Sequence, residues 1–293
     1  MKLSGVMPAL VTPFDAKGEV DFKAFEAHLT MLRAAGVTGW VPCGSTGEYS
    51  FLSDQEREAV LRFVKDFARP GETLIAGTNA PHTKGVIANT KKAKEIGYDT
   101  VLLATPFYTK PSQAELIAHF NAVLDAVDIN IVLYSYPGKD GVELEWELLD
   151  ALADHPRVIG IKESSGVVQR AVGIASRYKN RLQLISGSDD VALDFMFWGA
   201  DCWICGPANC MAKACCDLDR SYRQGDLATA KQQMLALYAA MNALESGKFV
   251  QKVKYGCELQ GIPVGQARAP LGALTAEEKA QFSTAMDPIL NWA

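Results

Sequence analysis

Eight short apolar runs repeat along the first part of the chain, and segments with the apolar spacing of helices separate them. The runs are GVMPALVTPF, GVTGWVPCG, TLIAGTN, DTVLLATPF, INIVLYSYP, VIGIKESSG, LQLISGSDD and CWICGPANC. Strands that alternate with helices predict a parallel sheet, because each helix carries the chain back to the start of the next strand. We expect a (β/α)8 TIM barrel over residues 1–225, since closure removes exposed edge strands. An open, doubly wound α/β sheet is the alternative.

Residues 226–293 follow a different pattern, in which helical segments continue without a further strand. Helices are expected over 226–246, 249–260 and 275–290, and glycines follow the first two of them as helix-ending residues. We interpret this part as a C-terminal helical appendage that is too small to fold alone.

Composition narrows the classes of function. The 293-residue chain is 48% hydrophobic and has a formal net charge of −5. Nucleic acids and anionic membrane surfaces attract concentrated positive charge, which is missing here, so we expect a small-molecule partner, with no nucleic acid and no membrane. The first residues lack the features of a signal peptide, and no apolar run approaches the roughly 20 residues of a membrane span. These features predict a cytoplasmic protein.

Lys162 stands where the sixth apolar run ends. Side chains at the C-terminal ends of barrel strands converge on one mouth, where the active sites of such barrels lie. Burial at this point disfavours the ammonium form and lowers the pKa of a lysine amine. A neutral amine is a nucleophile that forms a Schiff base with a carbonyl group. The alternative interpretation is a lysine that extends to solvent or pairs with Glu163.

Tyr134 ends the apolar part of the fifth run, in the position equivalent to that of Lys162. It is therefore expected to face Lys162 across neighbouring strands. A phenol in this place can carry protons on and off a carbinolamine as a general acid and base. By itself, Tyr134 is equally typical of a packing residue with its hydroxyl at the surface.

The loop CGSTGEYS follows the second run. Gly44 and Gly47 permit a tight turn with inward-facing amides. The hydroxyls of Ser45 and Thr46 would complete a donor-rich cradle for a small carboxylate. The spacing alone also fits an ordinary Gly-Ser turn.

Three further groups of residues suggest weaker candidate sites. Five of the seven cysteines lie within 202–216, but no second C-x2-C pair completes a zinc site, so we expect buried, reduced thiols and no metal. Of the four histidines only His82 follows a strand, and a surface role is expected for it. Asp189 and Asp190 follow the seventh run, and their charge argues against a phosphorylated substrate and against pyridoxal phosphate on the lysine. We expect them to cap a helix N-terminus.

Several motifs occur in one order along nearly the whole chain: TPF, GSTGE, TPFY, YSYP, GIKESSG, SGSDD and VKYGCELQGIPVGQARAP. With them the chain resembles the dihydrodipicolinate synthase and N-acetylneuraminate lyase family of Schiff-base-forming class I aldolases. The resemblance implies a (β/α)8 barrel with C-terminal helices, assembled as a homodimer or homotetramer. It also implies a lyase or synthase that acts on pyruvate or a related 2-keto acid with no metal and no organic cofactor.

The resemblance implies roles for individual residues. Lys162 matches the Schiff-base lysine, Tyr134 the tyrosine that shuttles protons, and Ser45 the hydroxyl that relays them. Tyr108 resembles the tyrosine that is lent to the site of a neighbouring subunit. The substrate-binding positions that match, through side chains or backbone, are Thr46, Gly44, Gly47, Gly187 and Ile204.

One departure from the family pattern concerns the second substrate. The synthases carry an arginine two residues after the proline of Tyr-x-x-Pro, where it grips the carboxylate of aspartate semialdehyde, whereas this chain has Lys139. An ammonium group cannot reproduce the two parallel hydrogen bonds of a guanidinium. Ser45 stands where threonine is commoner in the synthases. Three activities therefore stay open: the synthase reaction, aldol cleavage of a 2-keto-3-deoxy sugar acid or sialic acid, and deamination of a hydroxyproline-derived pyrroline carboxylate.

A keto-acid sensor is the non-enzyme alternative. The joint presence of Lys162, Tyr134 and Ser45 argues against it, because a protein that only binds a keto acid has no need of an electron sink. Lys139 is expected to contact the distal part of the substrate in an enzyme of this kind.

Overall fold

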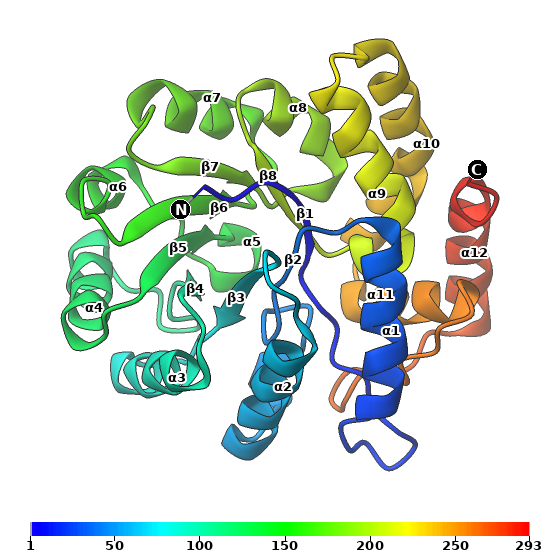
Figure 1. The fold of residues 1–293 in the computed structure, drawn as a ribbon, viewed down its shortest axis with the longest axis horizontal. Coiled ribbons are helices and arrows are strands. Elements are labelled where there is room, and N and C mark those ends of the chain that lie inside the picture. Colours follow the sequence, from blue (N-terminus) through cyan, green and yellow to red (C-terminus); the bar gives the residue numbers. More distant parts are fainter. Residues whose placement is uncertain (1, 293) are drawn as a thin grey trace.

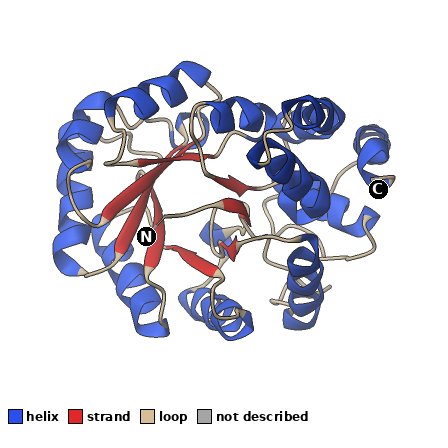
Figure 2. Ribbon diagram, turned by 45° about the horizontal axis from the view of Figure 1, so that its top comes forward, coloured by secondary structure: helices blue, strands red, loops and turns tan. Residues whose placement is uncertain are grey.

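The computed structural model describes residues 2–292, and its centre is a ring of eight parallel strands (Figures 1 and 2). The strands are β1 Gly5–Pro8, β2 Gly39–Trp40, β3 Thr73–Gly77, β4 Thr100–Ala104, β5 Asn130–Ser135, β6 Val158–Glu163, β7 Gln183–Ser186 and β8 Cys202–Cys205. They pair in the order β1-β8-β7-β6-β5-β4-β3-β2, and a parallel bridge between Ala9 and Val41 links the two ends. The (β/α)8 barrel is confirmed, and the open sheet is wrong.

Helices surround the strands in an outer layer, as Figure 2 shows. They are α1 Phe22–Ala35, α2 Asp54–Phe67, α3 Thr83–Ile96, α4 Gln113–Ala126, α6 Trp146–Leu152, α7 Val168–Arg177, α8 Ala192–Phe197 and α9 Ala208–Arg223. Capping boxes formed by Ser53 and Glu56, and by Ser112 and Glu115, start α2 and α4. Shorter helical turns occupy loops at the C-terminal ends of strands: η1 Tyr49–Phe51, α5 Pro137–Asp140 and η2 Asp189–Val191.

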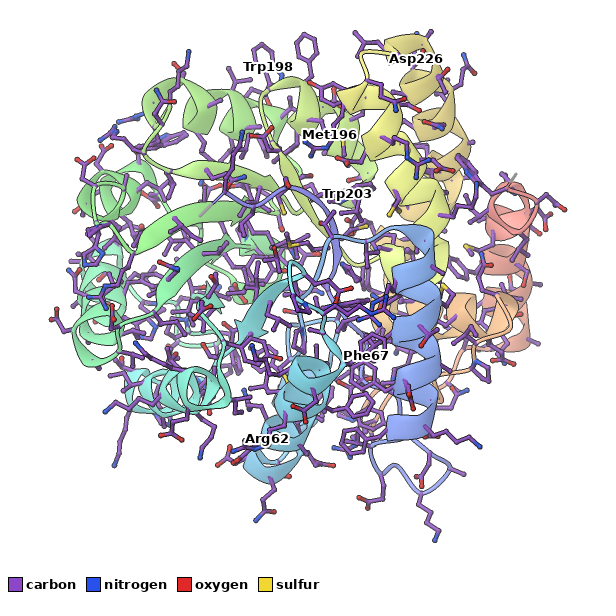
Figure 3. All side chains as sticks on the ribbon, in the orientation of Figure 1. Arg62, Phe67, Met196, Trp198, Trp203 and Asp226 are labelled. Atoms are coloured by element: carbon purple, nitrogen blue, oxygen red, sulfur yellow. The ribbon has the colours of Figure 1, made fainter. Side chains whose placement is uncertain are left out.

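The apolar side chains form two buried clusters, and the stick view of Figure 3 shows how densely side chains fill the space around the strands. The larger cluster packs the outer helices against the sheet. The smaller one fills the inside of the barrel and contains Tyr134 and Ile204. Its members come from most of the strands, as expected for a barrel whose interior is packed with side chains. These packed side chains fill the barrel below the opening at the C-terminal ends of the strands.

Three further helices follow the barrel, and Figure 1 shows the first two beside α9 and the third at the outer edge, near the C-terminus. They are α10 Leu227–Glu245, α11 Phe249–Leu259 and α12 Ala276–Leu290, within a residue or two of the expected segments. The division at residue 225 falls in the turn between α9 and α10, and whether it separates two domains stays a prediction. Within residues 2–292, none of the helices has both the length and the apolar character to cross a bilayer.

A buried ion pair ties this appendage to the loop after β2. The Lys254 Nζ atom on α11 lies 2.7 Å from Glu48 Oε1, and only 2% and 1% of the two side chains are exposed. The other carboxylate oxygen of Glu48 accepts the backbone amide of Arg268 at 2.8 Å. Glu48 itself has a φ of 56°, a left-handed conformation that an L-residue adopts only when its surroundings hold it there. The pair therefore helps to fix the GSTGE loop.

Candidate active site

The lysine and the tyrosine expected to carry the chemistry meet on neighbouring strands. Tyr134 on β5 pairs in register with Lys162 on β6, and the Lys162 Nζ atom lies 4.5 Å from the centroid of the Tyr134 ring. Both side chains are almost fully buried, with 5% of Tyr134 and 6% of Lys162 exposed. The strand register thus places a sheltered amine next to a phenol at the C-terminal end of the barrel.

The surroundings favour the uncharged form of this amine. Burial lowers the pKa of Lys162 to about 8, against the opposing effect of the Asp189 carboxylate, and the charge of Lys139 lowers it further. A substantial fraction of the amine is therefore neutral at mildly alkaline pH. This is the form that attacks a carbonyl carbon.

The alternative interpretation of Lys162, in which it pairs with Glu163 or extends to solvent, is wrong. Glu163 points to the other side of β6 and forms a buried ion pair with Arg170 on α7, with 3.0 Å between Arg170 Nε and Glu163 Oε2. Glu163 also accepts the backbone amide of Ser165 at 2.8 Å. The charge of Glu163 is therefore neutralised outside the barrel, and Glu163 does not pair with the Lys162 amine.

The phenol of Tyr134 keeps its proton at neutral pH. Burial and the neighbouring Tyr136 raise its pKa well above the usual value, whereas a hydrogen bond with the Ser45 side chain acts in the opposite direction. A protonated phenol can donate its proton to a developing oxyanion or leaving hydroxide. The contact with Ser45 also joins Tyr134 to the loop after β2.

That loop is a tight turn. The Gly47 amide donates to the Gly44 carbonyl oxygen at 3.0 Å, and a Cβ atom on Gly47 would lie 2.8 Å from the carbonyl oxygen of Leu10. Only glycine fits this close approach of two backbones. The Gly47 amide is used inside the turn and is not available to a ligand. The hydroxyls of Ser45 and Thr46 and the other amides of the turn are the candidate donors.

Gly187 and Ile204 lie on the far side of the lysine from Tyr134. A Cβ atom on Gly187 would lie 2.7 Å from Lys162 Cε and 2.0 Å from Ser164 Oγ, so a side chain there would displace the amine. Ile204 is fully buried in the cluster that fills the barrel. Their predicted roles in lining a pyruvate pocket fit these positions and stay predictions.

Asp189 does not cap a helix, and this expectation is wrong for Asp190 as well. The helix α8 begins at Ala192 without a side-chain cap, and both aspartates belong to the preceding turn η2. Asp189 is instead 4% exposed and accepts the indole N–H of Trp203, labelled in Figure 3, at 2.8 Å. Burial raises its pKa to about 7, while Lys162 lowers it. Asp189 is thus a carboxyl group beside the amine that no sequence motif indicated.

The other weaker candidates lie outside this site or have structural surroundings. All seven cysteines are free and buried, and residues 2–292 contain no group of three or more His, Cys, Asp or Glu side chains arranged to hold a metal ion. His82 precedes α3 and accepts the Gly85 amide through its Nδ1 atom at 3.0 Å, an exposed capping role.

Tyr108 lies in the loop after β4 and is 91% exposed. Its φ of 75° is a left-handed conformation that is rare for an aromatic residue. In a single chain this side chain is turned to solvent and is not packed into the barrel. Its predicted role in the site of a neighbouring subunit stays a prediction.

Two residues near Lys139 were not singled out from the sequence. The Lys139 Nζ atom lies 4.9 Å from the ring centroid of Tyr136 and 5.2 Å from that of Phe249, which begins α11. No motif indicates Phe249, because it belongs to the appendage and reaches the mouth only through the folding of α10 and α11. Lys139 does lie at the mouth, as the sequence analysis expected.

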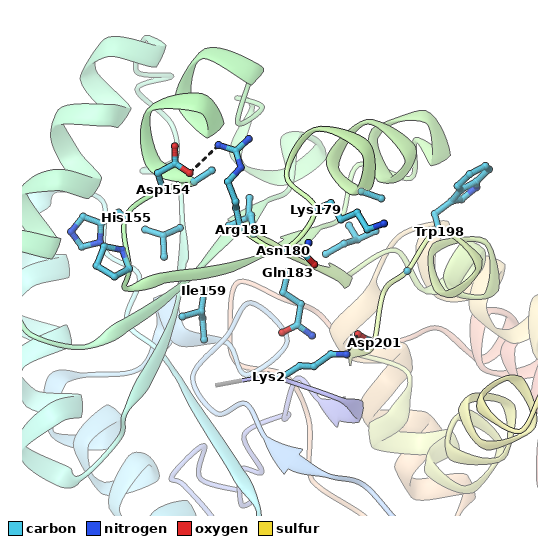
Figure 4. A pocket seen from close by; sticks show the side chains of 17 residues that line it. Lys2, Asp154, His155, Ile159, Lys179, Asn180, Arg181, Gln183, Trp198 and Asp201 are labelled. Carbon is cyan, nitrogen blue, oxygen red and sulfur yellow. Dashed lines mark hydrogen bonds and ion pairs between the residues drawn. The ribbon is translucent and has the colours of Figure 1, made fainter.

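A cavity of about 880 Å³ lies at the opposite end of the barrel (Figure 4). The first residues of β6 and β7, including Ile159 and Gln183, line it. Its charged groups include Arg181 and Asp154, which form an ion pair at 2.9 Å. In (β/α)8 barrels this N-terminal end serves stability and the C-terminal end serves catalysis. We therefore place the candidate active site at Lys162 and not in this cavity.

A (β/α)8 barrel with a buried amine beside a phenol at its mouth defines a class of enzymes, the lyases that act through a lysine Schiff base. Within that class, the model of the Dihydrodipicolinate synthetase family matches residues 2–288. The chain belongs to this family and is a Schiff-base-forming lyase of the class I aldolase type.

Curated relatives and solved structures agree with this assignment. Proteins named 4-hydroxy-tetrahydrodipicolinate synthase are 34% identical in an Exiguobacterium strain, over 97% of both chains, and 36% identical in Trichlorobacter lovleyi, over 96% of this chain and 97% of that one. A dihydrodipicolinate synthase from Acinetobacter baumannii, crystallised with pyruvate, is 31% identical with a TM-score of 0.94 over 98% of this chain and 99% of that one.

Proposed function

We propose that the chain forms a Schiff base between Lys162 and the ketone of pyruvate or a related 2-keto acid, and thereby makes or breaks the bond at the adjacent carbon. The observation that carries this proposal is the buried Lys162 amine, 4.5 Å from the centroid of the Tyr134 ring. The pyruvate complex of the Acinetobacter baumannii relative supports the choice of keto acid. The sensor alternative has no counterpart among the named relatives above.

The first step is attack of the neutral Lys162 amine on the ketone carbon. A carbinolamine results, and Tyr134 supplies the proton with which its hydroxyl leaves as water. Ser45, hydrogen-bonded to Tyr134, returns protons through the same phenol. The positive imine that forms is stabilised by the neighbouring Asp189, whose carboxylate already favours positive charge on this nitrogen.

Binding of the keto acid depends on the loop after β2 and on the space beside the lysine. Thr46, 6% exposed, holds the carboxylate with its hydroxyl, helped by amides of the Gly44–Gly47 turn. Gly187 leaves room for the substrate beside the lysine stem. The imine then loses a proton from the adjacent carbon to give an enamine, and this carbon is the nucleophile towards a second substrate.

The second substrate meets Lys139 and its surroundings. The relatives' name makes 4-hydroxy-tetrahydrodipicolinate synthesis the reference activity. This chain departs from the synthases in having Lys139 where they have an arginine. Sugar-acid cleavage and pyrroline-carboxylate deamination are the other two candidate activities, and both use the same first steps at Lys162.

Assembly and location are part of the proposal. Tyr108, exposed on one chain, would complete the proton relay of a second copy, so the active form is at least a homodimer, with a homotetramer as the family pattern. Seven buried free thiols favour a reducing compartment, in keeping with the predicted cytoplasmic location.

Reduction with borohydride in the presence of pyruvate tests the proposal. Pyruvate should become attached to Lys162, and peptide mapping should find the added mass on this residue alone. Lys139 is the internal control, because it lies at the same mouth and beside a phenol, but the hydroxyl of that neighbour, Tyr136, donates to Glu245. Label on Lys139, or none on Lys162, would contradict the proposed mechanism.

A further inference from the structure

Four side chains surround the outer part of the mouth, and we call them the distal subsite. They are Tyr136, Lys139, Glu245 and Phe249. The Lys139 ammonium rests between the rings of Tyr136 and Phe249, at 4.9 Å and 5.2 Å from their centroids. The hydroxyl of Tyr136 donates to Glu245 Oε2 at 3.4 Å. Glu245 is the last residue of α10, so the appendage supplies half of this subsite.

The distal subsite is continuous with the reacting centre. The ring of Tyr136 lies 6.1 Å from that of Tyr134, measured between centroids. On the other side, a Cβ atom on Gly206 would lie 2.6 Å from the Phe249 ring and 3.5 Å from Thr46 Oγ1, so the ring borders the predicted carboxylate cradle. A substrate attached at the lysine would extend between these two rings.

The negative charge of Glu245 partly offsets the positive charge of Lys139 within the distal subsite. Desolvation lowers the pKa of Lys139, while nearby carboxylates, that of Glu245 first, raise it. Asp140 and Asp189 act on Lys139 in the same direction as Glu245. An incoming carboxylate would therefore approach a cation that shares the Tyr136 side chain with the Glu245 carboxylate, and Glu245 would repel it. Hydroxyl groups suit the same surroundings, because they donate to carboxylates and accept from an ammonium.

We propose that Glu245 is a specificity-determining residue, and that the distal subsite takes a partner aldehyde with an uncharged, hydroxylated tail instead of a second carboxylate. This inference rests on the proposed function, because it concerns the partner of the Lys162 enamine. Glu245 accepts a hydrogen bond from one hydroxyl of the tail, and the Tyr136 oxygen, whose own proton goes to Glu245, accepts from another. Lys139 donates to an oxygen of the tail.

The reaction balances without an oxidant or a reductant. The methyl carbon of the pyruvate enamine bonds to the aldehyde carbon, and the aldehyde oxygen takes a proton from Tyr134 to become a hydroxyl. Water then adds to the imine carbon, the carbon–nitrogen bond breaks, and the Lys162 amine is released. The product is a 4-hydroxy-2-keto acid with a polyol tail, and the reverse sequence cleaves it.

Competition between two aldehydes tests the inference. Pyruvate consumption is measured with glyceraldehyde, which has a hydroxylated tail, and with aspartate semialdehyde, which has a charged one. We expect a higher kcat/KM for glyceraldehyde in the unmodified enzyme. Glu245→Gln should reduce the glyceraldehyde-to-semialdehyde ratio of kcat/KM by about tenfold or more, the range for loss of a hydrogen bond to a charged group.

The matched control is Glu258→Gln, the same exchange at an exposed position of α11, which should leave the ratio unchanged. A preference for aspartate semialdehyde, turnover of neither aldehyde, or an unchanged ratio in Glu245→Gln would overturn the inference. Borohydride trapping with pyruvate alone distinguishes a failure of this inference from a failure of the proposed function. Trapping at Lys162 in these cases leaves the proposed function standing, whereas absence of trapping removes both.

Discussion

Replacing Tyr134 with phenylalanine is expected to slow the pyruvate half-reaction by about 10²-fold to 10⁴-fold, the range for loss of a general acid–base group. The substitution keeps the ring against Lys162 and removes only the hydroxyl, which stays protonated because burial raises the pKa of Tyr134 well above its usual value. The measurement is exchange of the pyruvate methyl protons for deuterium, followed by proton NMR. This exchange reports imine and enamine formation without a second substrate.

Tyr178→Phe is the matched control. The hydroxyl of Tyr178 donates to Asp150 Oδ1 at 2.7 Å, in the outer helical layer. Its removal should cost about 1 kcal/mol of stability and leave the exchange rate unchanged. Equal exchange rates in Tyr134→Phe and the unmodified enzyme would show that another group moves the protons.

Replacing Lys254 with methionine is expected to lower the free energy of unfolding by about 3–5 kcal/mol, as for other buried ion pairs broken on one side. The Glu48 carboxylate, 1% exposed, would be left without its cation, although the Arg268 amide still donates to it. Urea unfolding measures the change. Deuterium exchange into pyruvate should also slow, because Glu48 fixes the loop that carries Ser45 and Thr46.

Two further variants isolate the role of the pair. Lys248→Met removes a lysine from an exposed ion pair with Glu278 on the same appendage, where little change in the free energy of unfolding is expected. The double variant Glu48→Gln, Lys254→Met removes both buried charges and should regain much of the lost stability. A Lys254→Met variant as stable as Lys248→Met would contradict this account of the loop.

The sequence was sufficient for the parts of the site that strand position determines. In a parallel barrel, residues that end neighbouring strands must meet at one edge, so the ends of the fifth and sixth apolar runs bring Tyr134 and Lys162 together. The eight runs and the change to helices alone after residue 225 likewise predicted the barrel and its appendage, because apolar periodicity reflects which face of each element is buried.

Other parts depend on contacts between residues distant along the chain. Asp189 and Asp190 are adjacent and chemically alike, and only the indole of Trp203 on β8 decides that Asp189 turns inward. Glu245 reaches Tyr136 because α10 packs against η2 and α9, and no local pattern encodes this packing. Asp189 was expected to cap a helix because an aspartate near a helix start usually does so. Here its side chain is buried and bonds to Trp203 instead.

The most direct test of the central claim is the pH dependence of trapping at Lys162. Single-turnover reactions with pyruvate, stopped with borohydride at different pH values, give the rate of imine formation on this residue. Because burial lowers the pKa of Lys162 to about 8, the rate should rise with pH through a midpoint near 8 and level off above it. A midpoint near 10.5, the ordinary value for a lysine, would contradict the account of a buried, largely neutral nucleophile.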